Sequence, residues 1–219
     1  MKPKLKIKIA VDVAMTFLLL LLMAYELVGE AAHEWLGIGI CALFVLHHVL
    51  NCGWSRTLRK KGRRSAFRAV QTILTACVAL TMIGSMGSGL LLSEYTFSFL
   101  PIRSIYSYAS RVHMLCAYWG FVFLGLHLGF HWNMIIGIAR RYFHPSRLRA
   151  WILRGAALLT AAYGIYAFEK RDIGNYMLLR YHFVYFDFTE PLLFFLLDYM
   201  AVLALFVMIG HCCAKICRG

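Results

Sequence analysis

The chain has 219 residues, of which 61% are hydrophobic and 15% charged, and its mean hydropathy is +0.68. This composition excludes an ordinary soluble domain and is typical of a protein that crosses a membrane several times. The formal net charge of +13 would suit a nucleic-acid partner, but the distribution of the charges argues against one.

Six apolar segments are each close to or above the roughly 20 residues that a helix needs to cross a bilayer. We therefore predict an all-α fold, a single membrane-embedded helical bundle of residues 1–219 with six transmembrane helices. The expected spans are residues 9–28, 34–54, 67–92, 112–138, 150–168 and 191–213. Lysines precede the first span as in a signal peptide, but its length, its Asp12 and the five spans that follow favour an anchored helix.

Basic residues gather on one side of these spans. Eighteen of the 23 lysines and arginines lie before span one, between spans two and three, around the junction of spans four and five, or after span six. Eight of the ten acidic residues lie on the opposite side. This is the positive-inside pattern, so we expect both termini in the cytoplasm. The net charge then reports membrane orientation, and we expect no nucleic-acid partner.

Two pairs of histidines share one spacing. His33 and His47 lie fourteen residues apart around span two, and His113 and His127 are equally spaced in span four. Fourteen residues of α-helix rise about 21 Å and return within roughly 40° of the same face. One antiparallel span separates spans two and four, so they run in the same direction. The first histidine of each pair is then near the outer surface and the second is nearer the inner surface.

Histidine is costly inside a membrane, and imidazoles on facing helices can hold haem iron from both axial sides. The spacing therefore predicts two b-type haems. The outer haem would be held by His33 and His113, and the inner haem by His47 and His127. The alternative is that these side chains only form hydrogen bonds inside the bundle.

Neighbouring polar residues offer supporting roles. His48 points about 100° away from His47, which makes it a poor substitute. His131 lies one turn beyond His127 and could ligate iron, bond to a haem propionate or line a quinone pocket; we favour a supporting role beside the haem. Asp12 could accept a ring N–H from a ligand imidazole or pair with a basic residue.

Arginines near the two sites are candidate partners for haem propionates, because guanidinium groups suit carboxylates. They are Arg103 and Arg111 for the outer haem and Arg68 for the inner one, although for each arginine a purely topological role is the more expected one. The small residues of segment 84–89 would leave room for an outer haem, but they also suit ordinary helix packing.

The C-terminal Cys212, Cys213 and Cys217 could bind a metal or carry a lipid, or be ordinary interfacial cysteines.

Several short motifs carry a family resemblance. In chain order they are His33-Glu34-Trp35-Leu36-Gly37, His47-His48-Val49-Leu50-Asn51, Ala117-Tyr118-Trp119-Gly120, Leu126-His127-Leu128-Gly129-Phe130-His131-Trp132, Phe186-Asp187-Phe188 and Leu197-Asp198-Tyr199. Together they resemble the flavinylation-associated cytochromes of bacteria, over nearly the whole chain. In broader layout the paired histidines are similar to cytochrome b of the quinol-oxidising complexes, to ferric reductases and to NADPH oxidases. The flavin and nicotinamide module of the oxidases is absent here, so NAD(P)H oxidation would occur on another protein.

The resemblance implies a multi-pass cytochrome b of the bacterial cytoplasmic (inner) membrane, with the same four histidines as iron ligands. It implies an electron-transfer subunit that partners extracytosolic proteins carrying covalently attached FMN. Membrane quinol is a candidate donor, and a flavinylated or haem-containing extracytosolic protein is a candidate acceptor. We expect no covalent flavin on this chain, since no acceptor motif is evident, and no catalytic residue. Two other functions stay open: a histidine-based proton or metal transporter without haem, and a monohaem membrane anchor of a redox complex.

Overall fold

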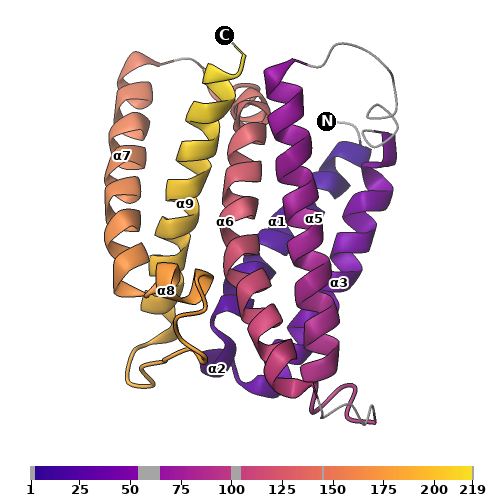
Figure 1. Ribbon diagram of the computed structural model, residues 1–219. Helices are drawn as coiled ribbons and strands as arrows, with labels where there is room; N and C mark the ends of the chain where they lie inside the picture. Colours follow the sequence, from indigo (N-terminus) through magenta and orange to yellow (C-terminus); the bar gives the residue numbers. More distant parts are fainter. Residues whose placement is uncertain (1–2, 54–64, 100–104, 145, 219) are drawn as a thin grey trace. The chain divides into compact units, whose positions relative to one another are not determined.

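The computed structural model describes residues 3–53, 65–99, 105–144 and 146–218. Within these ranges the regular secondary structure is entirely helical, as predicted (Figure 1). The helices are α1 (Pro3–Met23), α2 (Tyr25–Val28), α3 (Glu30–Leu50), α5 (Ala66–Leu92), α6 (Tyr106–Ala139), α7 (Arg147–Lys170), α8 (Ile173–Met177) and α9 (Leu192–Ile216).

Five helices, α3, α5, α6, α7 and α9, are long and apolar enough to cross a membrane. They correspond to predicted spans two to six, which supports a multi-pass membrane protein. The largest differences are at α3, which begins at Glu30 and ends at Leu50 where the prediction was 34–54, and at α6, which begins at Tyr106 where the prediction was 112. As a result His33 lies in the first turn of α3, inside the helix.

The predicted first span, residues 9–28, is not one helix. α1 already begins at Pro3 and ends at Met23, and the short α2 follows after Ala24. Gly29 then adopts φ +88°, a conformation that favours glycine, and separates α2 from α3. The residues on both sides of Ala24, Met23 and Tyr25, are apolar or aromatic, so hydropathy gave no sign of the break at that position. α1 has the length to span a bilayer, but four charged residues, Lys4, Lys6, Lys8 and Asp12, lie within its first ten positions.

The close contacts divide the chain into two compact units. The first comprises Met1–Arg63, Met86–His113 and Tyr185–Leu196, and the second comprises Arg64–Ser85, Met114–Val184 and Leu197–Gly219. In the first unit α1 packs along α3 and α2 joins them (Figure 1). One contact of this pair joins Leu18 to the backbone of Gly39, where a Cβ would lie 3.8 Å from the leucine methyl.

Glycines allow the helices of the second unit to approach closely. A Cβ on Gly129 of α6 would lie 2.3 Å from the carbonyl oxygen of Val207 in α9, and a Cβ on Gly210 of α9 would lie 2.4 Å from that of Leu126. Because lipid tails are as apolar as the side chains, helices in a membrane associate through such close packing. These glycines fix α6 against α9.

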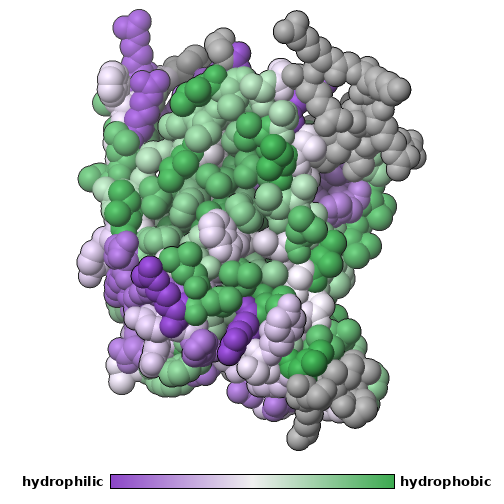
Figure 2. All heavy atoms as spheres, viewed as in Figure 1, coloured by the Kyte–Doolittle hydropathy of each residue, from purple (hydrophilic) through white to green (hydrophobic). Residues whose placement is uncertain are grey.

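Hydrophobic side chains cover the visible face of α7 and α9 along the middle of both helices, and hydrophilic ones lie toward the helix ends (Figure 2). On α7 the large exposed side chains include Leu148, Trp151 and Leu159, and Leu159 is 75% exposed. Exposed apolar patches of this kind are unusual on soluble proteins and are expected where lipid surrounds a helix. The surface therefore agrees with the membrane assignment.

Candidate functional site

The outer histidine pair is brought together within the first compact unit. Gly29 turns the chain into α3, and its carbonyl oxygen accepts the backbone N–H of His33 at 2.9 Å. The ring of His33 faces the ring of His113 from α6, with centroids 6.1 Å apart and planes at 70°. Residues 80 positions apart in the sequence thus present two imidazoles to one another, as the equal spacing predicted.

This separation fits a shared metal ion. Two metal–imidazole bonds of about 2.0–2.1 Å, with about 1.1 Å from each ligating nitrogen to its ring centre, place opposed imidazole centres roughly 6.3 Å apart. The observed 6.1 Å is close to that value.

One nitrogen of the pair lacks a partner. Nδ1 of His33 is buried and has no hydrogen bond within the described part of the chain. A buried polar atom without a partner costs about 1–3 kcal/mol, so native structures rarely keep one without a reason. Coordination of iron through Nδ1 would remove this cost, whereas coordination through Nε2 would not, so the fit of this pair to a haem rests on the separation of the two rings.

The surroundings of His113 suit an iron ligand. Its Nδ1 lies 3.2 Å from the hydroxyl of Ser88, which is buried in α5. A serine hydroxyl can accept the ring N–H, which leaves the other nitrogen deprotonated and able to ligate. At Gly89 a Cβ would lie 3.3 Å from Cε1 of His113, so a larger residue would crowd the ring.

Aromatic residues enclose the other side of the pair. Tyr25 of α2 meets His33 edge-on at 5.2 Å between ring centroids, and Phe186 meets Tyr25 at 6.3 Å. The Tyr25 hydroxyl donates to Glu30 at 3.1 Å. Tyr25 and Phe186 thus pack one behind the other on the His33 side of the pair.

The inner histidine of α3 is held by a carboxylate. Nδ1 of His47 lies 2.7 Å from Oδ1 of Asp12 in α1. The side chain of Asn51 donates to the His47 carbonyl at 2.9 Å and accepts from the ammonium of Lys8 at 2.9 Å. Of the two partners considered for Asp12, the structure provides the imidazole. A histidine that ligates a metal commonly donates its other ring N–H in this way.

The second unit contains His127 and His131, whose ring centroids are 4.8 Å apart. The Gln71 amide nitrogen lies 3.2 Å from Nε2 of His131, and the Thr75 hydroxyl lies 3.5 Å from Nδ1 of His127. An amide N–H can only donate, so Nε2 of His131 is its acceptor. This bond favours a supporting role for His131. His47 belongs to the other unit, so its pairing with His127 stays a prediction.

The remaining predicted residues are less informative. His48 is exposed, and its Nδ1 bonds to the carbonyl of Phe44 at 2.9 Å, which agrees with its exclusion as a ligand. Arg68 and Arg111 are exposed on α5 and α6, and Arg103 lies outside the described residues. Their roles at haem propionates stay predictions. Across the described ranges no three His, Cys, Asp or Glu side chains are grouped so that they could hold a metal ion.

The sequence analysis assigned no role to Asp198, although a carboxylate within so apolar a span indicates that the residue has a specific role. It is only 1% exposed. Oδ1 accepts from the hydroxyl of Tyr163 at 2.5 Å, and Oδ2 accepts from Lys170 at 2.8 Å and from Nη2 of Arg171 at 2.6 Å. These contacts join α9 to the end of α7, so the role of Asp198 is structural.

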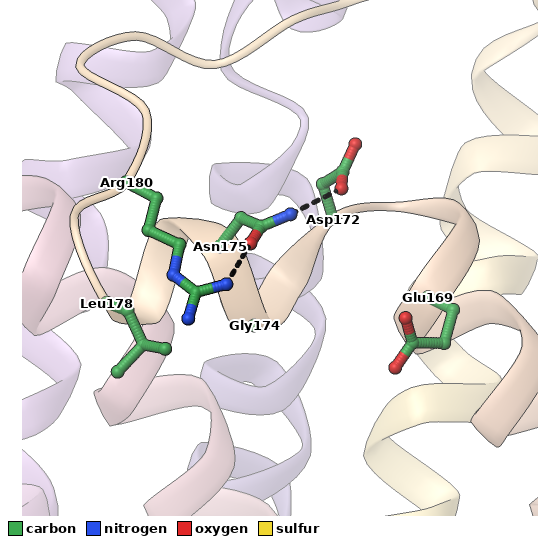
Figure 3. Close-up of a pocket in the computed structure, with 6 residues that line it drawn as sticks. All are labelled: Glu169, Asp172, Gly174, Asn175, Leu178 and Arg180. Atoms are coloured by element: carbon green, nitrogen blue, oxygen red, sulfur yellow. Dashed lines mark hydrogen bonds between the residues drawn. The ribbon is translucent and has the colours of Figure 1, made fainter.

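A small polar pocket of about 220 Å³ lies beside this end of α7 (Figure 3). Its lining includes Asp172, Asn175 and Arg180, which are joined by hydrogen bonds (Figure 3). Asn175 donates to Asp172 at 2.8 Å and accepts from Arg180 at 3.4 Å. The polar groups largely satisfy one another, and we assign the pocket no role.

The sequence matches no family model, and neither a curated protein nor a solved structure matches it significantly. The assignment of function therefore depends on the residues and their geometry.

Proposed function

We propose that this protein is a dihaem b-type membrane cytochrome that carries electrons across a bacterial cytoplasmic membrane. The proposal places one haem between His33 and His113 and the other between His47 and His127. It includes α1 as a sixth span and places both termini in the cytoplasm, in keeping with the charge distribution.

The outer histidine pair carries the proposal. Two imidazoles from separate apolar helices lie at the separation that a shared iron requires, and Nδ1 of His33 is buried without a partner in the described chain. The resemblance of the surrounding motifs to flavinylation-associated cytochromes points the same way.

In this proposal haem supplies reversible one-electron chemistry, and the chain supplies ligation, orientation and an apolar setting. Ser88 and Asp12 accept the ring N–H groups of His113 and His47 and so orient the imidazoles. Tyr25 and Phe186 pack on the His33 side of the outer site. The fourteen-residue spacing along α3 sets the two sites about 21 Å apart along the helix.

The proposed partners follow from the family resemblance. The donor would be membrane quinol or another reduced carrier, and the acceptor a flavinylated FMN protein, or another redox protein, outside the cytoplasm. The chain would act as an electron-transfer subunit and would carry no covalent flavin itself.

The test is a dithionite-reduced minus oxidised spectrum of the purified protein, with pyridine haemochrome quantitation. We expect a b-type spectrum with about two haems per chain. A protein without haem, after expression with ample haem supply, would refute the proposal and favour a histidine-based proton or metal transporter.

A monohaem membrane anchor is the second candidate, because the outer pair is complete within one compact unit while the inner pair involves both. It predicts about one haem per chain, bound at the outer site. In that case H33A would remove all the haem, whereas H47A would remove none.

A further inference from the structure

The carboxylate of Glu34 binds a whole turn of chain at the end of α5. Its Oε1 accepts the backbone N–H of Glu94 at 2.7 Å and that of Tyr95 at 3.2 Å. Its Oε2 accepts the Ser93 hydroxyl at 2.6 Å, and the backbone N–H and hydroxyl of Thr96, both at 2.8 Å. Three successive backbone N–H groups and two hydroxyls therefore converge on one side chain.

Such convergence is a strong and specific contact. An ionised carboxylate offers about four lone-pair sites, and these donors occupy both oxygens. Successive backbone N–H groups that point inward form a concave anion site, and hydrogen bonds to a charged acceptor are roughly twice as strong as neutral ones. Here the anion in the site is the carboxylate of Glu34, a residue of the same chain. The turn that follows α5 is thus fastened to the first turn of α3.

The hydrogen bonds of Glu34 connect the helical turn that carries His33 to the segment of α5 that contacts His113. Glu34 is the residue after His33 in α3, so the two share one rigid helical turn. Ser93 lies one helical turn beyond Gly89, and Ser88 and Gly89 both contact the ring of His113. The five donors therefore connect the helix that carries one imidazole to the helix segment that contacts the other.

A weaker contact on the same side reinforces the connection. The hydroxyl of Tyr95 donates to Oε2 of Glu30 at 3.3 Å, and Oε1 of Glu30 accepts from Tyr25, whose ring packs against His33. Glu30 and Tyr95 are exposed, so this link contributes less than Glu34 does.

We propose that Glu34 is a positioning residue for the outer haem site. It sets the separation and mutual orientation of His33 and His113 by holding the turn after α5 against α3, and it does not itself contact iron. This inference rests on the proposed function.

The test compares E34Q with E94Q. Glutamine keeps the shape of Glu34 but replaces one acceptor oxygen with an NH₂ group that cannot accept. Glu94 takes part in the turn through its backbone N–H while its side chain is exposed, so E94Q removes one negative charge from the turn that Glu34 binds and keeps the contact. The readouts are haem retention at each site, the low-spin ferric EPR signal of each haem, and hydrogen exchange at the amides of residues 94–96.

In E34Q we expect about tenfold weaker retention of the outer haem, the size of effect usual for removing a group that orients a metal ligand. We also expect a shifted or broadened outer-haem EPR signal and at least tenfold faster exchange at the three amides. The inner haem should be unchanged and serves as an internal reference. E94Q should match the wild type in every readout.

E34D keeps the negative charge on a side chain that is one methylene shorter. It is the test variant to use if E34Q folds poorly. We expect an intermediate effect, confined to the outer haem. Haem-loaded E34Q that is indistinguishable from the wild type, or equal loss of both haems in E34Q and E34D, would overturn the role of Glu34 alone. A wild-type protein without haem would overturn the proposed function, and with it this role.

Discussion

Replacing Asp12 with asparagine should raise the midpoint potential of the inner haem. The carboxylate lies 2.7 Å from Nδ1 of His47, and as an acceptor it makes that imidazole a more basic ligand, which stabilises ferric iron over ferrous iron. Asparagine keeps a neutral acceptor of similar shape, so the substitution removes mainly the charge.

The size of the effect follows from the burial of the pair. A hydrogen bond to a charged group contributes about 1.5–3 kcal/mol, and only part of it differs between the two oxidation states. The side chains of His47 and Asp12 are 30% and 39% exposed, so solvent screens the charge further. We take about 1 kcal/mol as the difference, which for one electron corresponds to a rise of about 40 mV.

Spectroelectrochemical titration of the purified protein measures this shift, with the outer haem as an internal reference. T16V is the matched control. Thr16 lies one turn further along α1, and its hydroxyl donates to the backbone oxygen of Asp12, so removing it should leave the carboxylate in place. An inner-haem potential that moves by less than about 10 mV in D12N, or equally in T16V, would refute the role of the carboxylate.

Three further predictions follow from the same geometry. H47A and H127A should each lose one haem and keep the outer one; a variant that binds both haems would show the inner ligands to be wrong. G89V should lose the outer haem, since a side chain there crowds the ligand ring, whereas G87V, with nothing within 4 Å of its Cβ, should keep it; haem quantitation of the two variants decides. D198A should lower the free energy of unfolding by about 3 kcal/mol, because it leaves two cations without their buried partner, and thermal unfolding in detergent should show it; an unchanged transition would contradict the structural role.

The sequence was sufficient for the features that depend on composition and local spacing. Hydropathy located α3, α5, α6, α7 and α9, because the length of an apolar segment is a direct consequence of bilayer thickness. It was wrong for α1, where the apolar residues continue past the end of the helix at Met23. The turn into α3, where Gly29 has a positive φ, lies in the interval that the prediction left between spans one and two. The feature that the sequence did not indicate is the earlier break at Ala24, which lies inside predicted span one.

For the outer site as well, some features could be predicted from the sequence and others could not. The equal spacing of the histidines, on two spans predicted to run in the same direction, placed His33 and His113 at matching depths and so predicted that they would meet. The role proposed for Glu34 could not be predicted, because its donors lie 59 to 62 residues away and converge only when the turn after α5 has folded. Asp12 was an intermediate case: its position near one end of an apolar helix suggested an imidazole partner but did not identify His47.

The continuity of the ligand-bearing helices bears on the choice between a cytochrome and a transporter. Transporters commonly bind their substrates where membrane helices are interrupted, because the unwound backbone supplies ligands and a hinge. Here α3 runs unbroken from Glu30 to Leu50, and α6 from Tyr106 to Ala139, through all four histidines. A continuous helix converts fourteen residues into a fixed distance of about 21 Å. Fixed sites suit electron transfer between two held cofactors, whereas alternating access requires the sites to move, so the helices themselves favour the cytochrome.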